Sequence, residues 1–168
     1  MIEQSYAMNR QNFLEAARAA GAELFEIPYK RQVASEIALV TDIAVLGDNN
    51  ASEVVVVASG LHGVELPAGS LLQQIWLKEL SKSLGQLKDI KFVFVHALNP
   101  HGAAFGMRTD WDLSGPGNID PARNFVDFKN PDTFSNTANE DISNALMKAD
   151  VSLFSSVAMW VRLLYSAF

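Results

Sequence analysis

The stretch that decides the fold is VVVVASGLHGVELPAG, residues 54–69. Its first five residues, Val54 to Ala58, are apolar without alternation, which is typical of a strand covered on both faces. Pro67 suits the first turn of a helix, and apolar residues recur behind it at helical spacing: Leu72, Ile75, Trp76, Leu80 and Leu84. A second apolar strand, IKFVFVHAL at residues 90–98, follows this helix. The order strand, helix, strand predicts a right-handed crossover between two parallel strands.

The upstream segments extend this unit into an α/β domain. Helical spacing predicts a helix over residues 12–20, and ELFEIPY at residues 23–29 reads as a short strand. The strands SEIALVTDIAVLG, residues 35–47, and SEVVVVASG, residues 52–60, are joined by the turn-rich DNNA and are expected to pair as antiparallel neighbours. We predict a three-layer α/β fold with a mixed, mainly parallel sheet and helices on both faces. The whole chain, residues 1–168, is expected to form a single domain that is incomplete at its C-terminal end.

The downstream part is less regular. Residues 99–139 are rich in Gly, Pro, Asn and Asp, and a loop of that length is usually functional or disordered. Residues 139–150 have helical spacing, and residues 151–168 form the most apolar stretch of the chain. A helix that is apolar on nearly all sides needs cover. We expect that cover from further chain or from a partner subunit, so a homo-oligomer through this C-terminal helix is one expectation.

Composition narrows the classes of function. With 49% hydrophobic and 19% charged residues, the 168-residue chain is typical of globular protein. A net charge of -6 and a pI near 5.0 argue against a nucleic-acid partner. The chain has no cysteine, which excludes disulfides, thiolate zinc sites and cysteine nucleophiles. Without a signal peptide or a clean membrane-spanning stretch, we expect a cytoplasmic protein with no membrane partner.

His62 and Glu65 are the first candidates for chemistry, because ligands of α/β proteins collect beyond the carboxyl ends of strands. An imidazole nitrogen and a carboxylate oxygen are both suitable zinc donors. Gly63 between them lets the backbone bend so that both side chains aim at one point. In the alternative reading, His62 bonds a nearby carbonyl and Glu65 caps the helix that begins at Pro67. Since a catalytic zinc needs a third protein ligand, this motif alone leaves both readings open.

Three blocks spanning residues 59–128 carry a family resemblance. They are, in order, SGLHGVELPAGS, VHALNPHGAAFGMR and NIDPARNFVDF. They resemble the zinc carboxypeptidase superfamily, and most closely its bacterial branch of carboxypeptidase-like metallopeptidases. In that branch the blocks look like Ser-Gly-x-His-Gly-Val-Glu-Gly, then His-Ala-x-Asn-Pro-x-Gly with an arginine following, then Val-Asp-Leu-Asn-Arg-Asn-Phe. A match to all three blocks in order is a specific signal.

The resemblance implies a role for each matched residue. His62 and Glu65 would be zinc ligands, and Arg108 would polarise the scissile carbonyl and stabilise its oxyanion. Arg123, with Asn124 beside it, would bind a substrate carboxylate, for which a planar guanidinium is suited. The implied protein is a zinc metallopeptidase that cleaves peptide or peptide-like amide bonds through a metal-activated water.

The chain also departs from the family pattern. Pro121-Ala122 replaces the family's Leu-Asn, which puts the specificity for a terminal carboxylate in question. The family's third zinc ligand is a downstream histidine and its general base is a later glutamate, yet no histidine follows His101. His101 is therefore a candidate substitute ligand, whereas His96 at a strand end is expected to be a hydrogen-bonded structural residue. The chain thus looks like the N-terminal part of a carboxypeptidase-like domain.

Two other functions stay open at this point. The first is an amidohydrolase of N-acyl amino acids, of the desuccinylase and aspartoacylase type, whose relatives share a His-Gly-x-Glu start and an arginine block. The second is a non-catalytic remnant that acts by association through its C-terminal helix. Independently of these functions, Arg108 and Arg123 have an alternative role as solvated loop residues, paired with one of the nearby acids: Asp110, Asp112, Asp120 or Asp127.

Overall fold

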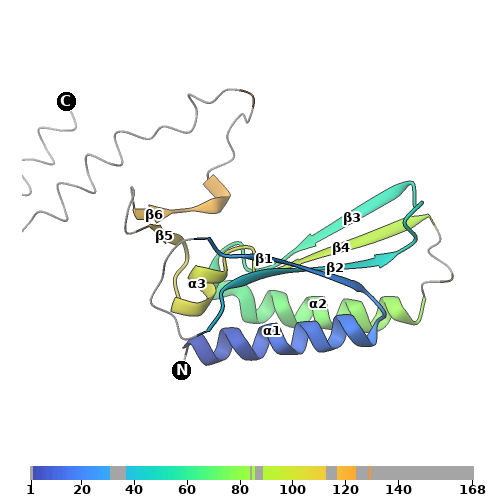
Figure 1. Ribbon diagram of the computed structural model, residues 1–168, viewed down its shortest axis with the longest axis horizontal. Coiled ribbons are helices and arrows are strands. Elements are labelled where there is room, and N and C mark those ends of the chain that lie inside the picture. The colour runs from blue at the N-terminus through green and yellow to red at the C-terminus, as the bar shows by residue number, and fades with distance from the viewer. Residues whose placement is uncertain are drawn as a thin grey trace, which may run out of the picture. The chain divides into compact units, whose positions relative to one another are not determined.

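The computed structural model describes residues 2–30, 37–83, 85, 89–112, 117–123 and 129. Its elements, in chain order, are α1 (Ile2–Ala19), β1 (Glu23–Pro28), β2 (Val40–Gly47), β3 (Glu53–Ala58), η1 (Gly63–Glu65), α2 (Leu66–Ser81), β4 (Ile90–His96), α3 (Pro100–Phe105), β5 (Asp110–Asp112), β6 (Gly117–Ile119) and η3 (Pro121–Arg123) (Figure 1). The helices predicted over residues 139–168 lie outside the described residues.

The chain divides into two compact units. Residues 1–110 and 120–123 form the first unit, and residues 111–119 and 124–168 form the second. The first unit holds the four-stranded sheet, the three α-helices and every described candidate residue. The expectation of a single domain concerns the whole chain and stays a prediction.

The four-stranded sheet has the strand order β1-β2-β4-β3. Strand β3 pairs with β4 in parallel, with α2 as the connection, so the predicted strand–helix–strand unit with two parallel strands is confirmed. The pairs β1–β2 and β2–β4 are antiparallel. The α/β class and the mixed sheet are thereby confirmed. The expected mainly parallel character is not met in these four strands, because β2 runs against both of its neighbours.

One strand pairing was predicted wrongly. We expected β2 and β3 to be antiparallel neighbours, but β4 lies between them and pairs with both. The connection from β2 to β3 passes over the start of β4, where Lys91 Nζ donates to the Asn49 carbonyl at 3.1 Å. The Glu53 N–H donates to the Asp89 carbonyl at 3.0 Å. Turn-forming residues predict that the chain reverses there, but the central position goes to β4, which buries Phe92 and Phe94 in the core.

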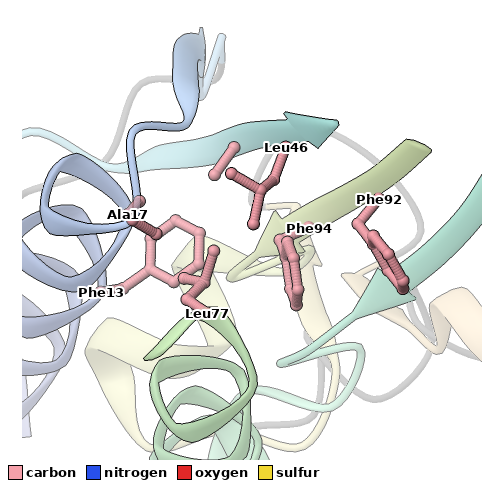
Figure 2. Packing of buried hydrophobic residues seen from close by; sticks show 8 residues of the cluster. Phe13, Ala17, Leu46, Leu77, Phe92 and Phe94 are labelled. Carbon is pink, nitrogen blue, oxygen red and sulfur yellow. The ribbon is translucent and has the colours of Figure 1, made fainter. Parts of the chain in front are cut away.

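The core of the first unit lies between the sheet and two helices. Figure 1 shows α1 and α2 side by side on one side of the sheet. Their apolar side chains meet those of the two central strands, as Figure 2 shows for Phe13, Leu77, Leu46 and Phe94. The register places Ala44 opposite Phe94, and Leu46 opposite Phe92, on this covered face. Helix α1 begins ten residues before the predicted helix and ends before Gly21, which has a φ of 77° that favours glycine.

The side of helix α2 that packs against the sheet is not the side that carries its regularly spaced apolar residues. Leu72, Ile75 and Trp76 are exposed, whereas the buried residues are Leu66, Ser70, Gln73 and Leu77. The Gln73 amide accepts the Ser59 hydroxyl at 2.8 Å and donates to the Val57 and Val95 carbonyls at 2.8 and 3.1 Å. This buried amide therefore joins the ends of β3 and β4, from which the candidate site extends.

The second face of the sheet is apolar and exposed among the described residues. Its exposed members are Phe25 and Ile27 of β1 and Val54 and Val56 of β3. The predicted cover on both faces of β3 is therefore not provided by the part of the chain that the structure describes. Among the helices of that same part, none combines the length and the apolar character needed to cross a membrane.

Candidate functional site

The candidate site begins where β3 ends. The chain turns after Ala58 through Gly60, whose φ is 67°, and then forms the short η1 turn that leads directly into α2. The Glu65 N–H donates to the His62 carbonyl at 3.0 Å, which closes this turn. As a result the Glu65 carboxylate lies against the imidazole, with Oε1 at 3.0 Å from His62 Nδ1. The turn therefore brings the two predicted zinc donors to one point.

The other nitrogen of the same imidazole faces a second carboxylate. His62 Nε2 lies 3.2 Å from Asp120 Oδ1, and the His62 side chain is only 11% exposed. Glu65 occupies the N-cap position of α2, but its side chain makes no capping hydrogen bond. The alternative in which the Glu65 side chain caps α2 is therefore wrong. The His62 ring contacts two carboxylates, those of Glu65 and Asp120.

Asp120 is the residue that sequence reasoning missed as part of this site. From the sequence, Asp120 is expected only as an ion-pair partner of the arginines. Its Oδ1 also accepts the Ala122 N–H at 2.9 Å. Although desolvation raises the pKa of the Asp120 carboxyl, the Ala122 N–H, His62 and Arg108 together lower it below its ordinary value. Asp120 is therefore an ionised acceptor next to His62. Its position in the NIDPARNF block is the sequence feature that could have identified it as a site residue.

Both predicted arginines reach the same carboxylates. Arg108 lies with Nη1 at 3.6 Å from Glu65 Oε1 and with Nε at 3.8 Å from Asp120 Oδ2. Arg123 Nε lies 3.4 Å from Asp120 Oδ2. The side chains of Arg108 and Arg123 are 53% and 82% exposed, so these are loose pairs at the surface. Ion pairs with such exposed guanidinium groups are weak, which leaves these groups available to a ligand. Asn124 lies outside the described residues.

His101 does not join this group. Its Nδ1 lies 3.2 Å from Asp110 Oδ1, and its ring stacks on Tyr29 with a centroid distance of 5.7 Å. Within the described residues, no group of three or more His, Cys, Asp or Glu side chains is arranged to hold a metal ion. The described residues therefore give no support to His101 as a substitute third ligand of His62 and Glu65.

His96 has the structural role that we expected. It is fully buried, its Nε2 lies 3.0 Å from the Ser70 hydroxyl, and its ring stacks on Phe13 at a centroid distance of 4.4 Å. Burial, with a smaller contribution from Arg10, lowers the pKa of His96 to about 4. A neutral, packed imidazole under a helix is a core residue.

The geometry of His62 and Glu65 fits two positions of a zinc site. Two ligands of a tetrahedral zinc ion with bonds of about 2.1 Å lie about 3.4 Å apart, close to the 3.0 Å between His62 Nδ1 and Glu65 Oε1. A zinc-bound histidine commonly donates its other ring N–H to a carboxylate, and Asp120 stands where such an acceptor is needed. Nitrogen and oxygen donors of this kind suit zinc. The described part of the chain thus supplies two donors and the carboxylate that orients one of them.

Comparison with known families gives a match over most of the chain. The family described as "Protein of unknown function (DUF2817)" matches residues 3–163, a range that includes every candidate residue of the site. A comparison with curated proteins found no match.

Proposed function

Starting from the fact that the chain belongs to the DUF2817 family, we propose that it is a zinc-dependent hydrolase of peptide or peptide-like amide bonds. The family description states no activity, so the proposal rests on the site. The observation that carries it is the imidazole of His62 between Glu65 and Asp120, with two exposed arginines beside them. The three sequence blocks that resemble the zinc carboxypeptidase superfamily contain all five of these residues.

His62 and Glu65 are the residues that would hold the metal, through Nδ1 and a carboxylate oxygen. Asp120 would accept the proton on His62 Nε2, which leaves the lone pair of Nδ1 directed at the metal. Bound zinc would supply Lewis-acid polarisation of the substrate carbonyl and an acidified water. Because the His62 side chain is 11% exposed and its orientation is set from both ring nitrogens, little conformational freedom is lost when it binds.

The two arginines divide the recognition of the substrate between them. Arg108, next to Glu65, would donate to the carbonyl oxygen that gains negative charge in the transition state. Arg123 would bind a substrate carboxylate, because its pairing with Asp120 is exposed and therefore weak. A substrate carboxylate could replace Asp120 as its partner at little cost, with Asn124 next to it in sequence.

The proposal also covers the fold family, the substrate, the cofactor, the location and the self-association of the protein. A zinc-carboxypeptidase-like, three-layer arrangement is supported by the exposed apolar face formed by Phe25, Ile27, Val54 and Val56, since parallel strands are normally covered on both faces. A peptide or an acyl amino acid is the proposed substrate, zinc the proposed cofactor, and the cytoplasm the proposed location. Self-association through the apolar residues 151–168 belongs to the same proposal.

The test of the function compares two substrate classes on zinc-loaded protein. We expect hydrolysis of peptides with a free C-terminal carboxylate, and loss of that hydrolysis in His62→Gln. Faster turnover of N-acyl amino acids than of dipeptides would assign the amidohydrolase activity instead. If neither class is turned over at high enzyme concentration, the proposed hydrolase is wrong for this chain.

Replacing Arg123 by methionine is expected to raise KM for a peptide with a free carboxylate by about 10- to 100-fold while leaving kcat nearly unchanged. The reason is that a hydrogen bond between charged groups is worth about 1.5–3 kcal/mol, and its loss from substrate and transition state alike appears in KM. Arg18→Met, a change in the last turn of α1, serves as the matched control. An unchanged KM in Arg123→Met would show that Arg123 binds no carboxylate.

Replacing Asp120 by asparagine is expected to weaken zinc binding by about 10- to 100-fold, as for other carboxylates that orient a zinc-bound histidine. The amide keeps the size of the side chain but is a poorer acceptor for the Nε2 proton of His62. Competition with a chromophoric chelator measures the zinc affinity. Asp48→Asn, at the exposed turn after β2, is the control and should bind zinc like the wild type. Equal affinities in Asp120→Asn and Asp48→Asn would remove Asp120 from the site.

A further inference from the structure

The chain contains two His-Gly pairs, His62-Gly63 and His101-Gly102, and their glycines are in contact. A Cβ atom added to Gly63 would collide with the Gly102 carbonyl carbon and the Ala103 nitrogen, so the two backbones are in direct contact. The Gly63 N–H also donates to the Arg108 carbonyl at 3.3 Å. The η1 turn that carries His62 and Glu65 therefore contacts α3 and Arg108, which lies three residues beyond the end of α3.

Asn99 holds the part of α3 on which this turn rests. Its side-chain Oδ1 accepts the Gly102 N–H at 2.8 Å, and its carbonyl accepts the Ala103 N–H at 3.1 Å. Asn99 is only 3% exposed. At the other end, the Gly102 carbonyl accepts the Met107 N–H at 2.8 Å, one residue before Arg108. A chain of backbone contacts thus runs from Asn99 through Gly102 to both Gly63 and Arg108.

We propose that Asn99, Gly102 and Gly63 are positioning residues that set the His62–Glu65 turn against Arg108. The proposal deepens the zinc hydrolase function and rests on it. Any shift of Gly102 moves Gly63, and Gly63 lies between the two metal donors in the chain. The same shift moves Met107 and with it Arg108. This assigns a task to the NPHG block, whose residues contribute no side chain to the site itself.

The test uses a pair of variants that add no bulk. Asn99→Ala removes the oxygen that accepts the Gly102 N–H, whereas Asn99→Ser keeps an oxygen acceptor at a position where serine and asparagine cap helices about equally well. We expect Asn99→Ala to weaken zinc binding by about tenfold, as a lost outer contact does at other zinc sites, and Asn99→Ser to restore it to within about threefold. Asn50→Ala, in the exposed turn between β2 and β3, is the control.

The zinc affinity separates positioning from plain stability. A cap that only stabilises α3 lowers the melting temperature, but it leaves the affinity of the folded molecules for zinc unchanged. We therefore expect the melting temperature and the zinc affinity both to fall in Asn99→Ala. A fall in melting temperature with an unchanged zinc affinity would overturn the positioning role.

A second readout needs no metal. The chain has three histidines, so the ring resonances of His62 can be assigned in the metal-free protein by comparison with His62→Gln. We expect these resonances to move in Asn99→Ala and to return towards their wild-type positions in Asn99→Ser. If they stay in place in Asn99→Ala, the inference is wrong. Failure of the wild-type protein to bind zinc would overturn the proposed function alone, since the resonances decide the positioning role independently.

Discussion

Zinc at about 100 times its dissociation constant is expected to raise the melting temperature of the wild-type protein by about 5–10 °C and to leave that of His62→Ala unchanged. A ligand that binds only the folded state stabilises it by about 2.7 kcal/mol at this concentration. Within the described residues, His62 supplies the one imidazole that lies against Glu65, with Nδ1 and Oε1 3.0 Å apart. Its removal leaves Glu65 as the one proposed ligand among the described residues, and a single carboxylate is expected to bind zinc too weakly to be saturated. Thermal unfolding with zinc or with a chelator measures the effect.

His101→Ala is the matched control for this experiment. His101 is nearly buried against Tyr29 and Asp110, so its replacement lowers the melting temperature of the metal-free protein. The zinc-dependent increase should nevertheless persist in His101→Ala, because His101 does not join the His62–Glu65 pair. A zinc effect that survives in His62→Ala but disappears in His101→Ala would move the metal site to His101 in α3.

Lowering the pH from 6.5 to about 4 is expected to cost the protein about 3 kcal/mol of unfolding free energy through His96 alone. Burial, followed by the charge of Arg10, lowers the pKa of His96 to about 4 from an ordinary value of 6.5. Above pH 6.5 the imidazole is neutral in both states, and stability is complete. Between pH 6.5 and 4 only the unfolded state takes up the proton, so stability falls as the pH falls. A shift of about 2.5 pKa units corresponds to about 3 kcal/mol.

Urea unfolding at a series of pH values in this window measures the effect, with His96→Gln as the comparison. Acidic groups and the other two histidines titrate in both proteins, so their contributions largely cancel in the difference. Asp42 is the cross-strand partner of His96 and pairs with Arg10 at 2.7 Å. We expect this ion pair to persist in His96→Gln, so that its contribution cancels as well. The difference in stability between the two proteins should shrink by about 3 kcal/mol from pH 6.5 to 4. A constant difference would mean that His96 takes up its proton in the folded state.

The elements of the fold could be predicted because their signals are local. The apolar run before Ser59, the proline at the start of α2 and the strand ending at His96 each fall within one element, and together they predict the parallel crossover. The position of β2 in the strand order, next to β4 and not next to β3, could not be predicted in the same way. The turn between β2 and β3 has the composition of a hairpin turn, yet strand order depends on which strand buries the most apolar surface, and that property belongs to the whole sheet.

The candidate site could be predicted in its motif residues but not in its contacts. His62, Glu65, Arg108 and Arg123 came from blocks of sequence, and the structure brings all four to one cluster. The role of Asp120 depends on its contact with the imidazole ring of His62, which lies 58 residues earlier in the chain. No spacing rule predicts such a contact. The buried amide of Gln73 was missed for a similar reason, because the apolar residues of α2 suggested a different inward face.

X-ray absorption at the zinc edge tests the central claim most directly, because it reads the ligands of the metal. The spectrum of the zinc-loaded wild-type protein should show one imidazole nitrogen together with oxygen donors at about 2.0–2.2 Å. The imidazole signal should vanish from the spectrum of His62→Gln measured at the same zinc content. A wild-type spectrum without imidazole, or an imidazole signal that persists in His62→Gln, would contradict the assignment of His62 and Glu65 as the pair that holds zinc.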